Sequence, residues 1–98
     1  MENKELNIEK FENAAARLRA LAHPLRIAMI ELLQKNERLT VTEIYQHLNI
    51  EQAAASHHLN ILKNKGILIT KRSGTHVLYS LKNQAIIDIL QCVDRCQN

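Results

Sequence analysis

The sequence predicts a mainly α-helical domain that carries one β-hairpin. Over most of its 98 residues, apolar side chains recur three and four positions apart, as in helices that bury one face. Between residues 67 and 81 apolar and polar residues alternate instead, around a central Ser73-Gly74-Thr75, which is typical of two strands joined by a turn. Only 3% of the residues are aromatic, so the core must be mainly aliphatic, which also favours packed helices.

Length and composition indicate a single domain over residues 1–98, because a chain of this size has no room for a second independent core. No apolar stretch approaches the roughly 20 residues that cross a bilayer. The charged start MENKELNIEK does not resemble a secretory signal. Cys92 and Cys96 form no disulfide framework of the kind found in secreted modules. We therefore expect a cytoplasmic protein without a membrane partner, in which both thiols are free.

The formal net charge of +3 favours an anionic partner only weakly, since many basic proteins bind no nucleic acid. The distribution of charge is more informative. Acidic residues crowd residues 1–12, whereas lysine and arginine predominate after Glu51. An anionic partner is therefore expected to contact the second half of the chain.

Two helices are expected before residue 37. The run ENAAARLRALA is rich in strong helix formers and predicts a first helix over residues 7–21. His23-Pro24 interrupts it, and proline is tolerated at the first position of a new helix. This second helix is expected to last about ten residues and to end at Asn36-Glu37.

Two further helices precede the hairpin. The sequence Thr40-Val41-Thr42-Glu43 is a capping box, in which both side chains satisfy backbone N–H groups, and it predicts a short helix over residues 41–48. A fourth helix is expected over residues 51–64, with Gly66 as its C-terminal stop. Its inward stripe consists of Ala55, Leu59 and Leu62.

After the hairpin, a last helix is expected from Ala85 to Cys96. It is apolar over an unusually wide arc, and so small a domain needs a second surface to bury such a helix. A twofold homodimer provides that surface. The predicted order α-α-α-α-β-β-α is that of a winged helix-turn-helix, in which the hairpin forms the wing. We expect the dimer to form through the first and last helices.

The outward face of the fourth helix predicts binding to double-stranded DNA. Its side chains are short or polar, as a major groove requires, because base edges are read by hydrogen bonds and small residues permit close approach. We expect Gln52, Ser56 and His57 near base edges, and the basic tip of the wing along phosphates or in the minor groove. The complete predicted DNA-binding set is Gln52, Ala53, Ser56, His57, Asn60, Lys63, Lys71, Arg72 and Thr75. The alternative for the helix is an ordinary solvated face.

Three segments resemble the ArsR/SmtB family of winged-helix repressors across about residues 14–82. They are LAHPLRIAMIELL, TVTEIYQHLNIEQAAASHHLNILKNKGIL and KRSGTHVLYSL. The most specific part is SHHLNILKNKGIL, which is similar to the family's Ser-x-His-Leu recognition helix followed by Gly-Leu at the first wing strand. The resemblance implies a homodimer, two recognition helices in successive major grooves of an inverted-repeat operator, and release from DNA when an inducer binds.

The resemblance does not extend to the family's metal sites. A Cys-x-Cys pair at the start of the third helix is replaced by Thr40 and Thr42, whose hydroxyls do not hold a soft metal. The ligand positions of the family's second metal site, in the last helix, fall on Asn83, Ala85 and Cys96, and the sequence stops before the glutamate that completes that site. We expect no metal and no cofactor. His58 is expected to pack beside the core or to contact backbone.

Cys92 and Cys96 are the remaining sensor candidates. Residues four apart share one face of a helix, so the two thiols are placed to respond together to a soft ion or an oxidant. A three-thiolate arsenite site cannot form within one subunit, because the chain has two cysteines. The alternative is that both are small buried hydrophobes that extend the apolar stripe of the helix.

Competing functions remain at this point. A repressor without metal or redox sensing has the same sequence features, and a winged-helix module that binds protein and not DNA predicts weak affinity for DNA with little dependence on salt. An enzyme is not expected, because the sequence has no phosphate loop, nucleophile elbow, Cys-His pair at plausible spacing or cluster of carboxylates.

Overall fold

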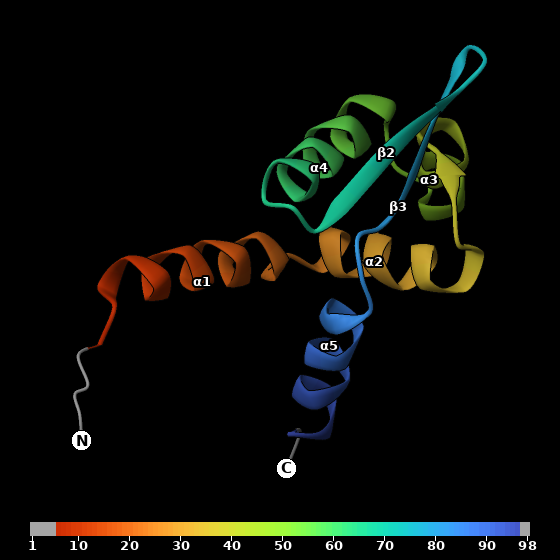
Figure 1. The fold of residues 1–98 in the computed structure, drawn as a ribbon. Helices are drawn as coiled ribbons and strands as arrows, with labels where there is room; N and C mark the ends of the chain where they lie inside the picture. Colours follow the sequence, from red (N-terminus) through yellow and green to blue (C-terminus); the bar gives the residue numbers. More distant parts are fainter. Residues whose placement is uncertain (1–5, 97–98) are drawn as a thin grey trace.

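The fold was analysed in a computed structural model, which describes residues 6–96. Five helices and a three-stranded antiparallel sheet form the architecture shown in Figure 1. The elements are α1 (Ile8–Leu21), α2 (Pro24–Asn36), β1 (Leu39–Thr40), α3 (Val41–Leu48), α4 (Gln52–Asn64), β2 (Leu68–Ser73), β3 (His76–Leu81) and α5 (Ala85–Arg95). The predicted helices and hairpin are confirmed in order, and α2 is somewhat longer than expected.

The strand β1 was not predicted. It has two residues, too few for an alternating pattern to be recognised, and it pairs antiparallel with β3 so that the sheet order is β1-β3-β2. Leu39 pairs with Tyr79 and Thr40 with Leu78. The pairing connects the segment between α2 and α3 to the base of the wing.

Polar side chains cap the starts of three helices. Oδ1 of Asn7 accepts a hydrogen bond from the Lys10 N–H at 3.2 Å. Nδ1 of His23 accepts one from the Leu25 N–H at 3.1 Å, next to Pro24 in the first turn. The capping box at α3 is confirmed, because Thr40 and Glu43 each accept a hydrogen bond from the backbone N–H of the other. These caps satisfy N–H groups that otherwise lack a partner within the helix.

The end of α4 has the geometry of a Schellman motif. The Ile67 N–H donates to the Leu62 carbonyl at 2.9 Å, and the Gly66 N–H donates to the Lys63 carbonyl at 3.0 Å. Gly66 has φ of +73°, a conformation that costs little without a Cβ atom. The predicted stop at Gly66 is confirmed, and it sets the direction in which the chain leaves α4 to enter β2.

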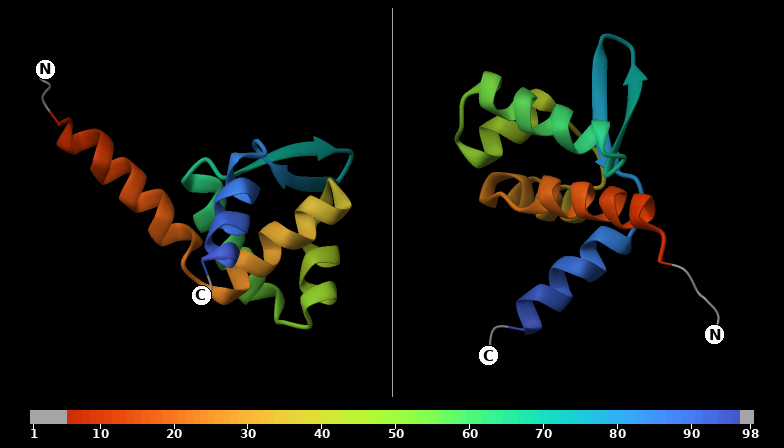
Figure 2. Two further views of the ribbon diagram at one scale, coloured as in Figure 1. Left: turned by 90° about the horizontal axis from the view of Figure 1, so that it is seen from below. Right: turned by 90° about the vertical axis from the view of Figure 1, so that its left-hand side faces the viewer.

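The core lies between α2, α3, α4 and one face of the sheet. The largest fully buried side chains are Met29, Ile30, Leu33, Ile44, Leu59, Leu62, Ile67 and Leu68. In contrast, α1 buries only Ala20 and Leu21, and α5 buries only Ile87. Figures 1 and 2 show these two helices extending out of the body. None of the helices within residues 6–96 is long and apolar enough to cross a membrane.

Candidate nucleic-acid interface

The helices α3 and α4 form the helix-turn-helix. Their connection begins at Asn49, whose left-handed backbone (φ 56°, ψ 49°) is one that asparagine tolerates better than most residues. The inward face of α4 consists of Ala55, Leu59 and Leu62, each 0% exposed, together with the largely buried His58. The predicted inward stripe is therefore confirmed, and it fixes which side of α4 faces outward.

The outward side of α4 carries all six of the residues predicted there. Ser56 is half-buried, and the others are exposed in the chain. The set comprises Gln52, Ala53, Ser56, His57, Asn60 and Lys63. Small side chains and hydrogen-bonding groups are thus gathered along one helix face, which is the composition that close approach to base edges requires.

The wing projects beyond the body at the end away from α5 (Figure 1). Its strands are joined through Gly74 and Thr75, and Gly74 adopts φ of +64° as a tight hairpin turn requires. All side chains from residue 71 to residue 76 are exposed. The tip is therefore free to contact an extended partner.

The register of the hairpin separates the two wing cations. Arg72 pairs with Val77 and shares a face with the buried Leu68, whereas Lys71 pairs with Leu78 on the opposite face. Successive residues of a strand point to opposite sides of the sheet. The two cations were expected to form one basic tip, and the structure does not bring them together.

Comparison with known proteins identifies the family. The chain matches the family model described as "Bacterial regulatory protein, arsR family" over residues 23–70. It is also 33% identical to the transcriptional repressor PagR of Bacillus anthracis over 86 residues, which are 88% of this chain and 86% of PagR. The chain belongs to the ArsR family.

Three further comparisons agree with this assignment. The HTH-type transcriptional regulator MJ1325 of Methanocaldococcus jannaschii is 36% identical over 87 residues, 89% of this chain and 98% of that protein. The crystal structure of PagR superimposes with a TM-score of 0.78 at 31% identity, covering 89% of this chain and 99% of PagR. That of NolR from Sinorhizobium fredii gives 0.83 at 26% identity, covering 97% of each chain.

Membership in the ArsR family makes this chain a transcription regulator with a DNA-binding winged helix-turn-helix. ArsR-family proteins are not enzymes, as the sequence analysis had predicted. The predicted resemblance and the predicted winged fold are confirmed by the same comparisons.

Two of the positions where the family resemblance implies metal ligands carry side chains that hydrogen-bond to nearby backbone. Thr40 caps α3, and Oδ1 of Asn83 accepts a hydrogen bond from the Ala85 N–H at 2.9 Å at the start of α5. Over residues 6–96, no three His, Cys, Asp or Glu side chains come together in an arrangement that could hold a metal ion.

His58 links α4 to α2. Its side chain is 8% exposed, and its Nδ1 accepts a hydrogen bond from Nε of Arg26 at 3.1 Å. Its ring centroid lies 4.4 Å from that of His23, and Arg26 also donates through Nη1 to the Ala20 carbonyl at 3.2 Å. The expectation that His58 packs beside the core is confirmed. Its partners were missed, because Arg26 lies 32 positions away and no local pattern connects the two.

Burial lowers the pKa of His58 from its ordinary value of 6.5, and the positive charges of His23, Arg26 and His57 lower it further. The neighbouring His57 differs, since it is exposed and its ring is tilted by 60° from that of His58. The lowered pKa favours the neutral imidazole of His58, in which Nδ1 accepts the hydrogen bond from Arg26.

Cys92 and Cys96 are both exposed. This corrects the alternative that they are buried hydrophobes, because α5 packs on the core through another part of its surface, which carries Ile86, Ile87 and Leu90. The two thiols share their side of α5 with Ile89 and Val93 at positions i, i+3, i+4 and i+7. Val93 is 65% exposed, so α5 has a second, uncovered apolar stripe.

Proposed function

We propose that this ArsR-family protein is a homodimeric repressor, with residues 1–98 as one DNA-binding domain, and that α4 reads an inverted-repeat operator in the major groove. The observation that carries the proposal is the outward face of α4, which is uncovered and composed of small or hydrogen-bonding side chains. Gln52, Ser56 and His57 are assigned to base edges. The remaining helix contacts are Ala53, Asn60 and Lys63.

The wing is assigned to the phosphate backbone or the adjacent minor groove through Lys71, Arg72 and Thr75. Their exposure supports this role. Arg72 shares its strand face with the side of the sheet that packs on the helices, whereas Lys71 is on the other side. We therefore assign the larger phosphate contact to Arg72.

The homodimer is assigned to α1 and α5. On α1, Ile8, Phe11 and Leu18 follow helical spacing and are 62%, 47% and 54% exposed. On α5, the stripe of Ile89, Cys92, Val93 and Cys96 is likewise uncovered. Monomers rarely leave two such stripes in water, and a twofold partner covers both. A dimer also doubles the number of phosphate contacts.

Release from the operator is assigned to an inducer, with the thiols of Cys92 and Cys96 as the sites at which a thiol-reactive or oxidising signal acts. Exposure of both thiols supports this role. When two thiols form a disulfide, they lose two protons and two electrons to an oxidant such as hydrogen peroxide, which is reduced to water. Because both thiols lie on the proposed dimer stripe, this oxidation acts on the dimer. The DNA-binding role supports a cytoplasmic location.

The test is a binding titration on DNA from upstream of the protein's own gene and on an unrelated duplex, over a series of salt concentrations. We expect tighter binding to the upstream DNA and a loss of about a thousandfold or more in affinity between 50 and 200 mM salt, if about six phosphates are contacted. Weak binding to both duplexes with little dependence on salt contradicts the proposal and favours a protein-binding module.

The thiol role is tested in the same assay with hydrogen peroxide, arsenite or zinc added. Oxidant is expected to release the wild-type protein from DNA, while the Cys92→Ser, Cys96→Ser double variant stays bound. If the double variant is released equally, the signal acts elsewhere. If neither protein responds to any of the three additions, the repressor is controlled by another inducer or by none.

A further inference from the structure

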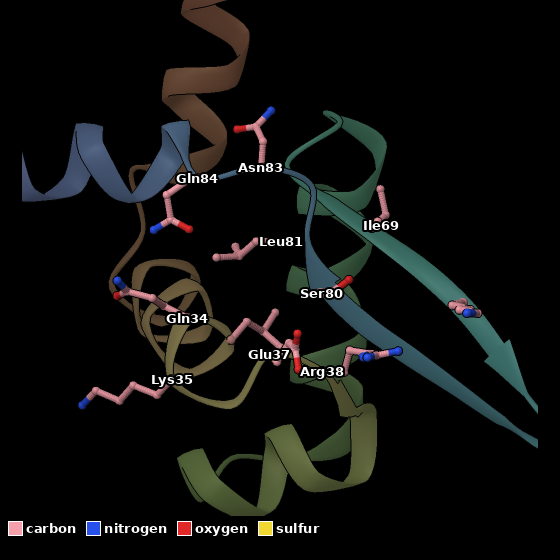
Figure 3. A pocket seen from close by; sticks show the side chains of 11 residues that line it. Gln34, Lys35, Glu37, Arg38, Ile69, Ser80, Leu81, Asn83 and Gln84 are labelled. Atoms are coloured by element: carbon pink, nitrogen blue, oxygen red, sulfur yellow. The ribbon is translucent and has the colours of Figure 1, made fainter.

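An open pocket of about 660 Å³ lies between the end of α2, the hairpin and the start of α5. It is shown in Figure 3, where the side chains of Leu81 and Gln84 point into the space between α2 and β3. The hairpin contributes Ile69, Lys71 and Ser80 from the strand face opposite to the buried Leu68, and Leu81 from the face that Leu68 shares. No residue of α4 lines the pocket, so it is separate from the outward side of that helix.

The charge of the pocket is positive. Lys35, Arg38 and Lys71 line it together with one carboxylate, that of Glu37. The three cations come from α2, from the turn after it and from β2, so they approach the pocket from different elements. In Figure 3 the guanidinium of Arg38 is directed toward the hairpin. Within residues 6–96, none of the side-chain hydrogen bonds engages these cations. They are available to an anion.

The pocket also has apolar walls. Leu33 is fully buried beneath it, Leu81 is half-buried, and Ile69 remains 46% exposed on a strand that is otherwise polar on that face. Amide groups of Gln34 and Gln84 stand at the edge. Sites for small molecules have volumes of about 300–1,000 Å³ and combine an apolar lining with a few polar groups that fix orientation. This pocket has the size and the composition of such a site.

The turn that carries two of the charged groups is strained. Glu37 has φ of 56° and ψ of −57°, and the Arg38 N–H donates to the Asn36 carbonyl across it, as in a γ-turn with positive φ. Side chains larger than glycine rarely adopt this backbone, and strained residues are frequent at ligand sites. The turn holds Glu37 and Arg38 at the mouth of the pocket.

We propose that this pocket binds a small organic anion. Arg38 and Lys71 bind its carboxylate or phosphate group, Lys35 adds positive charge at the edge, and its short apolar chain lies against Ile69. A guanidinium and an ammonium form charge-assisted hydrogen bonds with either head group. The apolar chain explains why Ile69 is left uncovered on the wing.

A ligand at this position touches the end of α2, both strands of the wing and the start of α5. It therefore favours one arrangement of the wing relative to the helix assigned to the dimer, and a ligand shifts an equilibrium toward the arrangement it binds better. This regulatory consequence rests on the proposed function. The binding itself does not, so it is tested without DNA.

The test is a titration of the isotopically labelled full chain, followed by NMR amide shifts. The probes are hexanoate, hexyl phosphate, the neutral hexanamide and inorganic phosphate. We expect hexanoate or hexyl phosphate to shift the amides of residues 34–38, 69–71 and 83–84 with a Kd of about 1 mM or lower. The one that binds more tightly identifies the head group. Hexanamide and inorganic phosphate are expected to bind at least about tenfold more weakly.

Two variants test the two halves of the site. Arg38→Gln is expected to weaken binding about tenfold through the lost charge, and Ile69→Ser about fivefold through the lost apolar contact. Lys65→Gln removes a charge that is also exposed, at the C-cap of α4, and is the matched control, with unchanged binding. Shifts caused equally by inorganic phosphate indicate an adventitious ion only and overturn the proposal. Equal binding of hexanamide, unchanged binding by Arg38→Gln, or no saturable shift with either organic anion also overturns it.

If both organic anions fail to bind while the protein still binds its upstream DNA, the pocket is wrong and the DNA-binding proposal stands. If an anion binds at the pocket and the chain does not bind DNA, the DNA-binding proposal is wrong and the pocket stands. Both measurements use the same preparation of the full chain, so the two proposals fail separately.

Discussion

Arg26 and His58 join the start of α2 to α4 through a hydrogen bond of 3.1 Å between Nε and Nδ1. Because the guanidinium is always the donor, Nδ1 must be unprotonated for the bond to form. Protonation of His58 adds a second positive charge beside Arg26 and removes the acceptor. The contact therefore makes the packing of α4 against α2 dependent on pH.

We predict that the free energy of unfolding falls as the pH is lowered below about 6.5, where unfolded His58 begins to bind a proton that the folded protein resists because its pKa is lowered. The stabilisation from the neutral imidazole is fully present above this pH and is lost toward the folded pKa. His58→Gln keeps an acceptor without titrating, and it should cost about 1 kcal/mol at pH 7.5. The difference in unfolding free energy between His58→Gln and the wild type, measured by urea unfolding, should be smaller at pH 5 than at pH 7.5.

The matched control is His57→Gln, because His57 is exposed on the same helix and has no resolved contact with Arg26. Its unfolding free energy should keep most of the pH dependence of the wild type, because the charge of His57 is the smallest of the causes that lower the pKa of His58. If the unfolding free energies of the wild type and His58→Gln change equally between pH 7.5 and 5, His58 is not the group that makes stability depend on pH.

Ser56 and His57 are predicted to read base edges. The double variant Ser56→Ala, His57→Ala should lower the ratio of specific to non-specific affinity by at least tenfold, since each lost base contact is worth about 1–3 kcal/mol. Binding to an unrelated duplex should change much less. Parallel titrations of both duplexes measure the ratio, with Asn13→Ala on α1 as an exposed control. An unchanged ratio removes these residues from direct reading.

Arg72 and Lys71 should contribute unequally to binding, because the hairpin register places them on opposite faces. Arg72→Gln is expected to flatten the slope of log affinity against log salt by about one unit, the value for one lost phosphate contact, for specific and unrelated duplexes alike. Lys71→Gln removes the same charge from the adjacent position and should have a smaller effect. A larger effect for Lys71→Gln would reverse the assignment of the two faces.

The sequence predicted the elements that local chemistry determines. The capping box at Thr40 and Glu43, Pro24 in the first turn of α2 and the stop at Gly66 each depend on residues within six positions of one another, and all three occur as expected. The inward face of α4 was also predicted, since helical periodicity determines which residues share a side.

The features that were missed depend on residues far apart in the chain. The two-residue strand β1 exists because Leu39 and Thr40 meet β3, and neither residue alone indicates a strand. The contact between Arg26 and His58 spans 32 positions. The opposite faces of Lys71 and Arg72 follow from strand alternation and were open to prediction, but the pair was treated as one tip. The exposure of Cys92 required knowledge of which side of α5 faces the core.

Glu37 is predicted to be a site of stored strain. Glu37→Gly removes the Cβ atom at φ of 56° and ψ of −57° and should raise the free energy of unfolding by about 1 kcal/mol. Asn49→Gly is the matched control, because Asn49 has the same φ but lies in the left-handed helical region that asparagine tolerates. It should change stability by only a few tenths of a kcal/mol. Equal changes measured by urea unfolding would indicate that the turn at Glu37 is unstrained.

Val93 is predicted to lie in the dimer interface, at the centre of the uncovered stripe of α5. Val93→Asp places a carboxylate where the partner's apolar surface is expected, and an unpaired buried charge costs several kcal/mol, so dimer affinity should fall by at least a hundredfold. Sedimentation equilibrium measures this, with circular dichroism to verify the fold. Ile69→Asp is the control, because Ile69 is also an exposed apolar residue but belongs to the wing. It should leave the dimer intact.

A wild-type protein that sediments as a monomer, or a Val93→Asp variant that remains dimeric, contradicts the assignment of Val93 to the dimer interface. Because both half-sites must be bound together for full affinity, the monomeric variant should also lose most of its binding to upstream DNA while keeping its helical content.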